Sequence, residues 1–281
     1  MTAKSTIDGA KRVPRYFAAL MGHWGPQDWW PVYTRLEVIV GAFLTQNTSW
    51  KNVEGALRNL RRRGLLNLDG LRNASIRELE AAVRPSGYFR QKAERLKNFV
   101  RFLDAQYGGS LTRLFRRPTP ELRTELLELN GVGPETADSI LLYAGGHPVF
   151  VVDAYTRRVF ERHGVLRGGE KYEEVRELIE RALEQETGGG WQEAGFRPAA
   201  ALSEPRRHKF QLHRTAPAAK VFDEYHALLV QVAKHHCRKQ EPLCHGCPLE
   251  PFLPVRGPLP ARDARPKRRG TIRKEKRTPA P

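Results

Sequence analysis

The sequence predicts an all-α protein. Apolar residues recur at helical spacing in almost every periodic segment of the chain. The only cluster of β-branched residues is the short stretch PVFVV at 148–152. The chain has 281 residues, enough to bury a large core in one or two domains. No apolar run is long enough to cross a bilayer, so we expect neither a membrane span nor a membrane partner.

Capping signals place the ends of several helices. TRLE at 34–37 is a capping-box pattern that precedes a run of apolar residues, and TP at 119–120 is typical of a cap followed by proline at the first helical position. SIRELEAAV and RQKAERLKNFVRFLDAQY are two amphipathic runs, the second of which ends at the glycines 108–109. A last helix is expected from about residue 223 to residue 234, directly before the cysteines.

Two segments do not have the pattern of a core. Residues 186–219 mix glycine, proline, alanine and arginine without a period, which indicates a long surface insertion. Residues 254–281 are rich in proline, lysine and arginine, and we expect a disordered tail there. This tail could attract phosphates or simply keep the protein soluble, and the sequence favours neither function.

The charge balance points to a polyanionic partner. The chain carries 48 Lys and Arg against 31 Asp and Glu, a formal net charge of +17. Residues 257–281 hold nine basic and two acidic residues, so they account for +7 and leave +10 on the rest of the chain. A folded part that is this basic favours nucleic acid as the partner.

A glycine-rich turn joins two predicted helices in TPELRTELLELNGVGPETADSILLYA. Gly131 and Gly133 permit positive φ and close backbone approach, and Pro134 is suited to the first turn of the next helix. Such a turn, Gly131-Val132-Gly133, exposes backbone N–H groups at the positive end of a helix dipole, where a phosphate oxygen can bind. A tight turn with a purely structural role is the alternative.

These motifs resemble a known family. LNGVGPETADSILLYA together with VFVVDAYTRRV is similar to the signature of the helix-hairpin-helix DNA glycosylases, the endonuclease III superfamily. LTQNTSWKNV and VRPSGYFRQKAERL resemble two other blocks of that family. Together they resemble most the branch that includes 3-methyladenine DNA glycosylase III, over roughly residues 25–185 and 223–250.

The resemblance implies a domain of residues 1–253 with two helical subdomains and a substrate cleft between them. Residues 34–143 would form a helical barrel that ends in the helix-hairpin-helix. Residues 1–33 with residues 144–236 would form the second subdomain, which contains the insertion. Residues 237–253 would form a cysteine loop ahead of the tail.

Asp153 is the candidate catalytic carboxylate. It follows VFVV and precedes AYTRRVF, so spacing alone predicts a helix N-cap and no more. In the family that this motif resembles, the matching aspartate is catalytic. A fixed carboxylate would stabilise the positive charge that develops on deoxyribose as the N-glycosidic bond breaks.

Glu135 is the candidate that decides the type of reaction. In the bifunctional members of the family, the position two residues after the second glycine holds a lysine that forms a Schiff base with the sugar. Here that position is Glu135, and a carboxylate cannot form a Schiff base. The resemblance therefore implies a monofunctional enzyme, with Glu135 lining a pocket for a cationic alkylated purine. A first-turn acid that favours the helix dipole is the alternative.

Aromatic residues are expected to hold an extruded base. The resemblance places Trp29, Trp30 and Trp50 at the base pocket, where flat apolar faces suit a flipped base. It also makes Gln46 and Tyr88 the residues that fill the gap left in the duplex. A loop glutamine and a surface tyrosine are the alternatives.

Three late cysteines, Cys237, Cys244 and Cys247, have a spacing that resembles the iron–sulfur loop of endonuclease III. In that family a fourth cysteine follows, but Leu253 stands at its place, and a [4Fe–4S] cluster takes four cysteines. A cluster with a different fourth ligand, a Cys3His zinc site or a loop without metal all remain open. The nearby candidates for a fourth ligand are His235, His236, His245 and Glu250.

The sequence therefore predicts a base-excision DNA glycosylase that flips a damaged base, most plausibly an alkylated purine, out of double-stranded DNA and hydrolyses its N-glycosidic bond. A bifunctional glycosylase/lyase on oxidised pyrimidines and a non-catalytic helix-hairpin-helix DNA-binding protein are the two alternatives. We expect a monomer in the cytoplasm of a prokaryote, associated with the nucleoid.

Overall fold

A computed structural model describes residues 9–27, 34–185 and 217–264 of the chain. The predicted all-α class is confirmed, since no residue in these ranges lies in a β-strand. The β-branched stretch 148–152 is extended but pairs with no other segment of the described chain. Across the same ranges, every helix is too short or too polar to traverse a bilayer.

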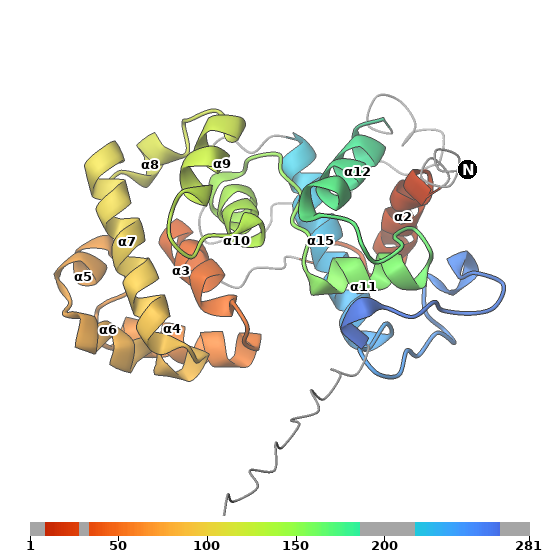
Figure 1. Ribbon diagram of the computed structural model, residues 1–281, viewed down its shortest axis with the longest axis horizontal. Helices are drawn as coiled ribbons and strands as arrows, with labels where there is room; N and C mark the ends of the chain where they lie inside the picture. Colours follow the sequence, from red (N-terminus) through yellow and green to blue (C-terminus); the bar gives the residue numbers. More distant parts are fainter. Residues whose placement is uncertain (1–8, 28–33, 186–216, 265–281) are drawn as a thin grey trace, which may run out of the picture.

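The helices form two groups that lie side by side (Figure 1). The first group consists of α3 (Arg35–Thr45), α4 (Trp50–Arg62), α5 (Leu68–Asn73), α6 (Ile76–Val83), the 3-10 turn η1 (Arg84–Ser86), α7 (Phe89–Tyr107), α8 (Leu111–Leu114), α9 (Thr119–Leu127), α10 (Pro134–Ser139) and the π-helix η2 (Ile140–Gly145). The second group consists of α2 (Arg12–Trp24), α11 (Ala154–Arg162), α12 (Tyr172–Gln185), α15 (Pro217–His235) and the 3-10 turns η4 (Glu250–Phe252) and η5 (Arg262–Ala264). The exact subdomain boundaries expected from the sequence remain predictions.

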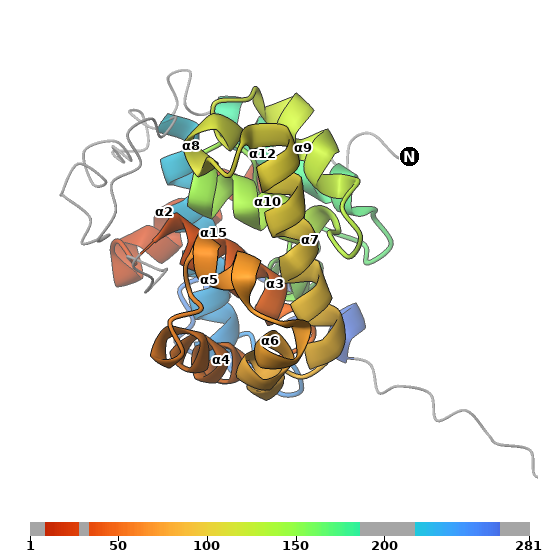
Figure 2. The same cartoon turned by 90° about the vertical axis from the view of Figure 1, so that its left-hand side faces the viewer.

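The first group is built around α3. Almost the whole of this helix is buried, from Leu36 to Leu44, so it is enclosed by its neighbours and does not lie along a surface. Helix α4 instead buries a single stripe, Val53, Ala56, Leu57 and Leu60. In Figure 2, α4 and α6 lie near one end of the long helix α7, with α8 and α9 near its other end. Each such fully buried leucine or valine stabilises the fold by about 1.5–3 kcal/mol.

The capping predictions are confirmed at one helix and wrong at another. At α3, the Thr34 hydroxyl accepts from the Glu37 N–H at 3.2 Å and Glu37 accepts from the Thr34 N–H at 3.1 Å, which completes the capping box. At α9, Thr119 is already helical and makes no cap hydrogen bond. Its hydroxyl lies 2.9 Å from Nδ1 of the buried His147, so a long-range contact replaces the expected cap.

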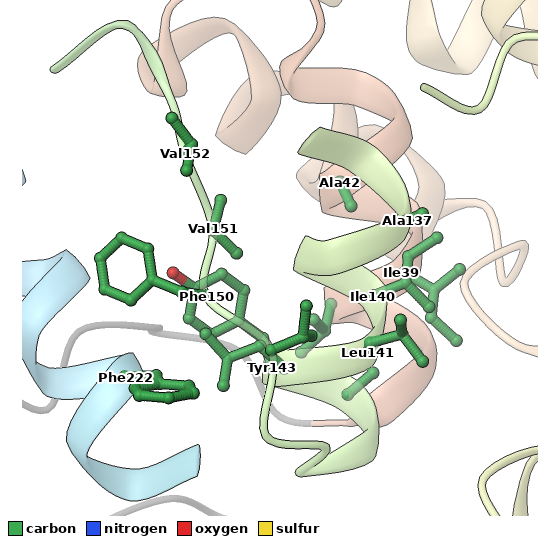
Figure 3. Close-up of a cluster of buried hydrophobic side chains, with 14 of the residues drawn as sticks. Ile39, Ala42, Ala137, Ile140, Leu141, Tyr143, Phe150, Val151, Val152 and Phe222 are labelled. Carbon is green, nitrogen blue, oxygen red and sulfur yellow. The ribbon is translucent and has the colours of Figure 1, made fainter. Parts of the chain in front are cut away.

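Extended residues after η2 connect the two groups. Figure 3 shows Phe150 and Val151 beside Tyr143 of η2 and Phe222 of α15. Phe150 and Phe222 pack edge-to-face with ring centroids 5.9 Å apart, a favoured aromatic geometry. The chain leaves this core at Asp153, which places that residue on the boundary between the groups.

The two segments that were expected to be irregular lie partly within the described residues. Residues 217–219 belong to α15, which corrects the end expected for the insertion, while residues 186–216 lie outside the described residues. Of the expected tail, residues 254–264 are described and residues 265–281 are not. Three contacts join the described part to α11: the Leu259 N–H donates to the Arg162 carbonyl at 2.9 Å, the Arg262 N–H donates to Oε2 of Glu161 at 2.6 Å, and Asp263 pairs with Arg158 at 2.5 Å.

Candidate active site

A cavity of about 540 Å³ opens where the two groups of helices meet. Residues of α3, α4, α10 and η2 line it from the first group, and residues of α11 and α15 line it from the second. Its size falls in the range of about 300–1,000 Å³ that is typical of small-molecule pockets. Four residues singled out from the sequence line it, namely Gln46, Trp50, Glu135 and Asp153.

Asp153 is the N-cap of α11, as predicted. Its Oδ1 accepts from the Thr156 N–H at 2.8 Å, and its Oδ2 lies 3.4 Å from Nε2 of His226. Burial on its own raises the pKa of Asp153, but His226 and the hydrogen bonds from Thr156 outweigh burial and hold the pKa below its ordinary value. Asp153 is therefore a carboxylate at neutral pH, and 14% of its side chain remains exposed toward the cavity.

Glu135 lies in the first turn of α10 and faces the same cavity. Burial, together with the nearby charge of Asp153, raises the pKa of this carboxyl group to about 7. His226 and Arg157 oppose this shift without cancelling it. Glu135 is therefore a carboxyl group that changes its charge near neutral pH.

The two carboxyl groups of the cavity thus differ in protonation. A pair whose surroundings push the two pKa values apart can divide chemical roles between a permanent anion and a group that gains or loses a proton. Here the permanent anion is Asp153 and the titrating group is Glu135. Helix N-termini alone would lower both pKa values, so the difference comes from burial and from the two neighbours of Asp153.

Two residues of the site were missed by sequence reasoning. The Tyr143 hydroxyl lies 2.6 Å from Nδ1 of His226, both side chains are buried, and both line the cavity. They are 83 positions apart, so no local spacing connects them. The one available signal was a histidine among the apolar residues of the helix that precedes the cysteines.

One of the three predicted pocket tryptophans can be placed. Trp50 begins α4, is half-buried and lines the cavity. Trp29 and Trp30 lie outside the described residues. The cavity therefore has at least one indole available for stacking against a flat ligand.

The hairpin turn before α10 has one glycine with positive φ. Gly131 has φ of +83°, and a Cβ there would lie 2.0 Å from Nε of Arg95, so glycine is required. Gly133 was also expected to use positive φ, but it is extended, with φ of −95°, and a Cβ there would meet no atom within 4 Å. The Val132 N–H donates to the Leu129 carbonyl at 2.9 Å, so this N–H is engaged within the turn. Phosphate binding by the turn remains a prediction that rests on its other two N–H groups.

Gln46 is held against this hairpin. Its Nε2 donates to the Gly131 carbonyl at 3.0 Å and to the Thr136 hydroxyl at 2.9 Å, while its Oε1 accepts from Arg95. Both ends of the amide are therefore engaged, which fixes Gln46 at the cavity edge. Its role in filling a gap in DNA remains a prediction.

Tyr88 lies exposed on a left-handed turn, and its role in filling a gap in DNA remains a prediction. The residue is 65% exposed, and its backbone lies in the left-handed region with φ of 45°. Such a conformation is rare for a tyrosine and is held only where neighbours enforce it. Beneath this turn the buried ammonium of Lys92 donates to the Leu44 carbonyl at 2.9 Å and to the Ser86 carbonyl at 2.7 Å.

The cysteine loop does not fit a four-thiolate cluster. Cys237, Cys244 and Cys247 line one hollow, but its volume is about 10 Å³, space for roughly one water. Leu253 also lines it and offers no donor atom. No group of three or more His, Cys, Asp or Glu within the described ranges is arranged to hold a metal ion. Burial raises the pKa of all three thiols, that of Cys247 to about 11, which disfavours the thiolate form.

Two buried arginines of α11 hold the loop. Arg162 donates to Sγ of Cys237 at 3.3 Å and to the carbonyls of Arg238 and Lys239 at 2.5 and 2.9 Å. Arg158 donates to the Cys237 carbonyl at 2.7 Å. The loop is therefore tied to the same helix whose N-cap is Asp153.

Known protein families and sequence relatives also match this chain. A family model described as HhH-GPD superfamily base excision DNA repair protein matches residues 40–185. The Methanocaldococcus jannaschii protein MJ1434, provisionally named a DNA repair glycosylase, is 40% identical over 239 residues, which cover 85% of this chain and 94% of that protein. Endonuclease III of Bacillus subtilis is 25% identical over 62% of this chain and 60% of its own length.

Solved structures show the same architecture. The H. pylori 3-methyladenine DNA glycosylase MagIII bound to 1,N6-ethenoadenine is 26% identical, with a TM-score of 0.63 over 80% of this chain and 97% of that one. A trapped covalent complex of endonuclease III with DNA is 20% identical, with a TM-score of 0.62 over 87% of this chain and 95% of that one. The second likeness is one of fold alone.

Proposed function

Because the chain belongs to the HhH-GPD superfamily of base excision DNA repair proteins and is a DNA glycosylase, we propose that it hydrolyses the N-glycosidic bond of an alkylated purine and leaves the strand uncut. One observation carries the proposal. An ionised aspartate and a glutamate share a cavity of base-binding size, and the glutamate stands where the bifunctional family members carry a lysine.

Asp153 supplies the electrostatic part of the reaction. As the glycosidic bond lengthens, positive charge grows on the sugar, and a carboxylate fixed at the cavity edge stabilises that charge. The Thr156 N–H holds Oδ1 of this carboxylate in place, so little reorganisation is needed during the reaction. The same carboxylate can align the attacking water.

Glu135 supplies the specificity. In its carboxylate form it attracts a base that carries a positive charge, as N3- and N7-alkylated purines do, more strongly than an ordinary purine. Trp50 offers an aromatic face on the same cavity, which also favours a cationic ring. The similarity to a 3-methyladenine DNA glycosylase at 26% identity agrees with this substrate class.

Base release and strand cleavage can be measured separately. The protein is incubated with duplexes that carry 7-methylguanine, 1,N6-ethenoadenine or thymine glycol, and each product is analysed with and without hot alkali. We expect release of the purine lesions and strand breaks only after alkali. Strand breaks without alkali, or release of thymine glycol alone, would instead favour the bifunctional alternative.

The lyase question needs one further control, because Lys234 of α15 also lines the cavity. Borohydride trapping is therefore performed with the wild type and with Lys234→Ala. We expect no covalent complex with either protein. A complex that forms with the wild type and disappears in Lys234→Ala would show that Lys234 acts as an amine nucleophile, although the lysine of the bifunctional family members is replaced here by Glu135.

A further inference from the structure

Tyr143, His226 and Asp153 form a connected series of polar groups on the inner wall of the cavity. The Tyr143 oxygen lies 2.6 Å from Nδ1 of His226, and Nε2 of His226 lies 3.4 Å from Oδ2 of Asp153. Each residue comes from a different element, namely η2, α15 and the start of α11. The series therefore crosses the boundary between the two groups of helices.

The local backbone is adapted to place Tyr143. It lies in a π-helix, a rare conformation that is frequent at functional sites. Figure 3 shows Tyr143 near Phe150 and Val151, on the side of η2 away from Ile39. The rings of Tyr143 and Phe150 lie 6.0 and 6.3 Å from the imidazole of His226, so His226 has little freedom to rotate.

Each contact in this series can be assigned a hydrogen-bond donor and an acceptor, from Tyr143 through His226 to Asp153. Burial raises the pKa of Tyr143 well above its ordinary value, so its oxygen keeps its proton and can donate it to Nδ1 of His226. A neutral imidazole that accepts at Nδ1 carries its own proton on Nε2. Nε2 is the nitrogen that faces Asp153. The other charged or titratable groups near these residues are Glu135, Asp223, Tyr172, Arg157 and Lys234.

We propose that His226 is a positioning residue for Asp153, with its Nε2–H tautomer set by Tyr143. It holds Oδ2 while the Thr156 N–H holds Oδ1, so the carboxylate keeps one orientation toward the sugar of a flipped nucleotide. The inference rests on the proposed function, in which Asp153 is the catalytic carboxylate. It adds that the orientation of Asp153 depends on α15 and η2 as well as on its own helix.

The first test requires no catalysis. Long-range ¹H–¹⁵N spectra of the imidazoles report which nitrogen carries the proton. We expect the Nε2–H form for His226 in the wild type at pH 7.5, and a loss of that preference in Tyr143→Phe. An Nδ1–H tautomer in the wild type, or spectra that Tyr143→Phe leaves unchanged, would overturn the proposal.

The second test follows the reaction. Single-turnover base release from a 1,N6-ethenoadenine duplex is measured for His226→Leu, His226→Gln and Tyr143→Phe. We expect losses of about 10–100-fold in rate with unchanged DNA affinity, and partial rescue by the N–H donor of Gln. A titration of the ¹³C-labelled Asp153 carboxyl should show a higher pKa in His226→Leu. An unchanged rate and an unchanged Asp153 pKa in His226→Leu would contradict the assignment.

Two control variants separate positioning from packing. His147→Gln changes another buried histidine outside the cavity, and Tyr225→Phe removes another buried hydroxyl, one that donates to the Val13 carbonyl at 2.9 Å. Both controls should keep the rate of base release within about twofold of the wild type. If wild-type protein releases no alkylated purine, the proposed function fails, and if Asp153→Asn retains base release, the catalytic role of Asp153 fails. The tautomer measurement tests His226 whatever the outcome of those assays.

Discussion

The cavity and the cysteine loop lie at opposite ends of α11. They differ in whether the residues singled out in the sequence form a site in the folded structure. In the cavity, residues from distant parts of the chain converge, and the pKa values of Glu135 and Asp153 are pushed in opposite directions. In the loop, the cysteine spacing resembles a metal site, but the hollow is small and Leu253 stands at the place of the fourth ligand. The cavity therefore brings together groups whose protonation differs, whereas the spacing of the cysteines alone does not establish a metal site.

The largest expected effect concerns the cavity. Asp153→Asn removes the charge of the catalytic carboxylate but keeps a side chain that can cap α11. We expect base release to fall by about 10³-fold or more, in line with the loss of a major electrostatic stabiliser. Single-turnover kinetics measure the loss, and electrophoretic mobility shifts with the same duplex should show DNA binding retained. Full activity in this variant would show that Asp153 is not the catalytic carboxylate.

The second effect concerns the loop. Arg162→Ala removes three hydrogen bonds that tie residues 237–239 to α11 and should lower the free energy of unfolding by about 3 kcal/mol. Urea denaturation measures this change. Arg181→Ala is the matched control, because Arg181 is exposed and pairs with Glu177 of its own helix at 2.8 Å, and its loss should cost less than about 0.5 kcal/mol. Equal losses in both variants would show that Arg162 does not hold the loop.

The third effect is a pH dependence of the cavity. Glu135 has its pKa raised to about 7, so it is neutral below that pH and a carboxylate above it. Release of a cationic base such as 7-methylguanine should therefore rise about tenfold between pH 6 and pH 8. Glu135→Gln should abolish this rise, because an amide does not titrate. A rise that persists in Glu135→Gln would assign the titration to another group.

The smallest effect is expected at the cysteines themselves. If the arginines hold the loop, Cys244→Ser should change the free energy of unfolding by less than about 0.5 kcal/mol, since Cys244 is only half-buried. Elemental analysis of wild-type protein, with an absorption spectrum of the fresh preparation, provides the check. Stoichiometric iron or zinc that is lost in Cys244→Ser would show that the loop binds metal with a ligand other than a fourth cysteine.

Local features of the fold could be predicted from the sequence. The apolar stripe of α4, the capping box at Thr34, the glycine end of α7 at Gly108 and the N-cap at Asp153 all depend on residues close in the chain. Helical periodicity and capping chemistry are local rules, so a single sequence is enough to apply them.

Long-range pairing could not be predicted. The contact of Tyr143 with His226, the contact of Thr119 with His147 and the pairing of Arg158 with Asp263 join residues that only the folded chain brings together. The last pairing also joins η5 to α11 although the composition of residues 254–281 resembles a tail. Likewise, the raised pKa of Glu135 depends on its burial beside Asp153, which composition does not reveal.

The π-helix also affects which side chains of α10 and η2 face the cavity. An α-helix advances by about 100° per residue, so side chains four positions apart drift by about 40° around the axis. The wider turn of η2 compensates for this drift, and Glu135, Ser139 and Tyr143, at successive four-residue steps, all face the cavity. Deleting one residue within 140–142 would restore a regular turn and rotate the tyrosine hydroxyl away from His226. The position of that hydroxyl is thus encoded by the number of residues in one turn as much as by the tyrosine itself.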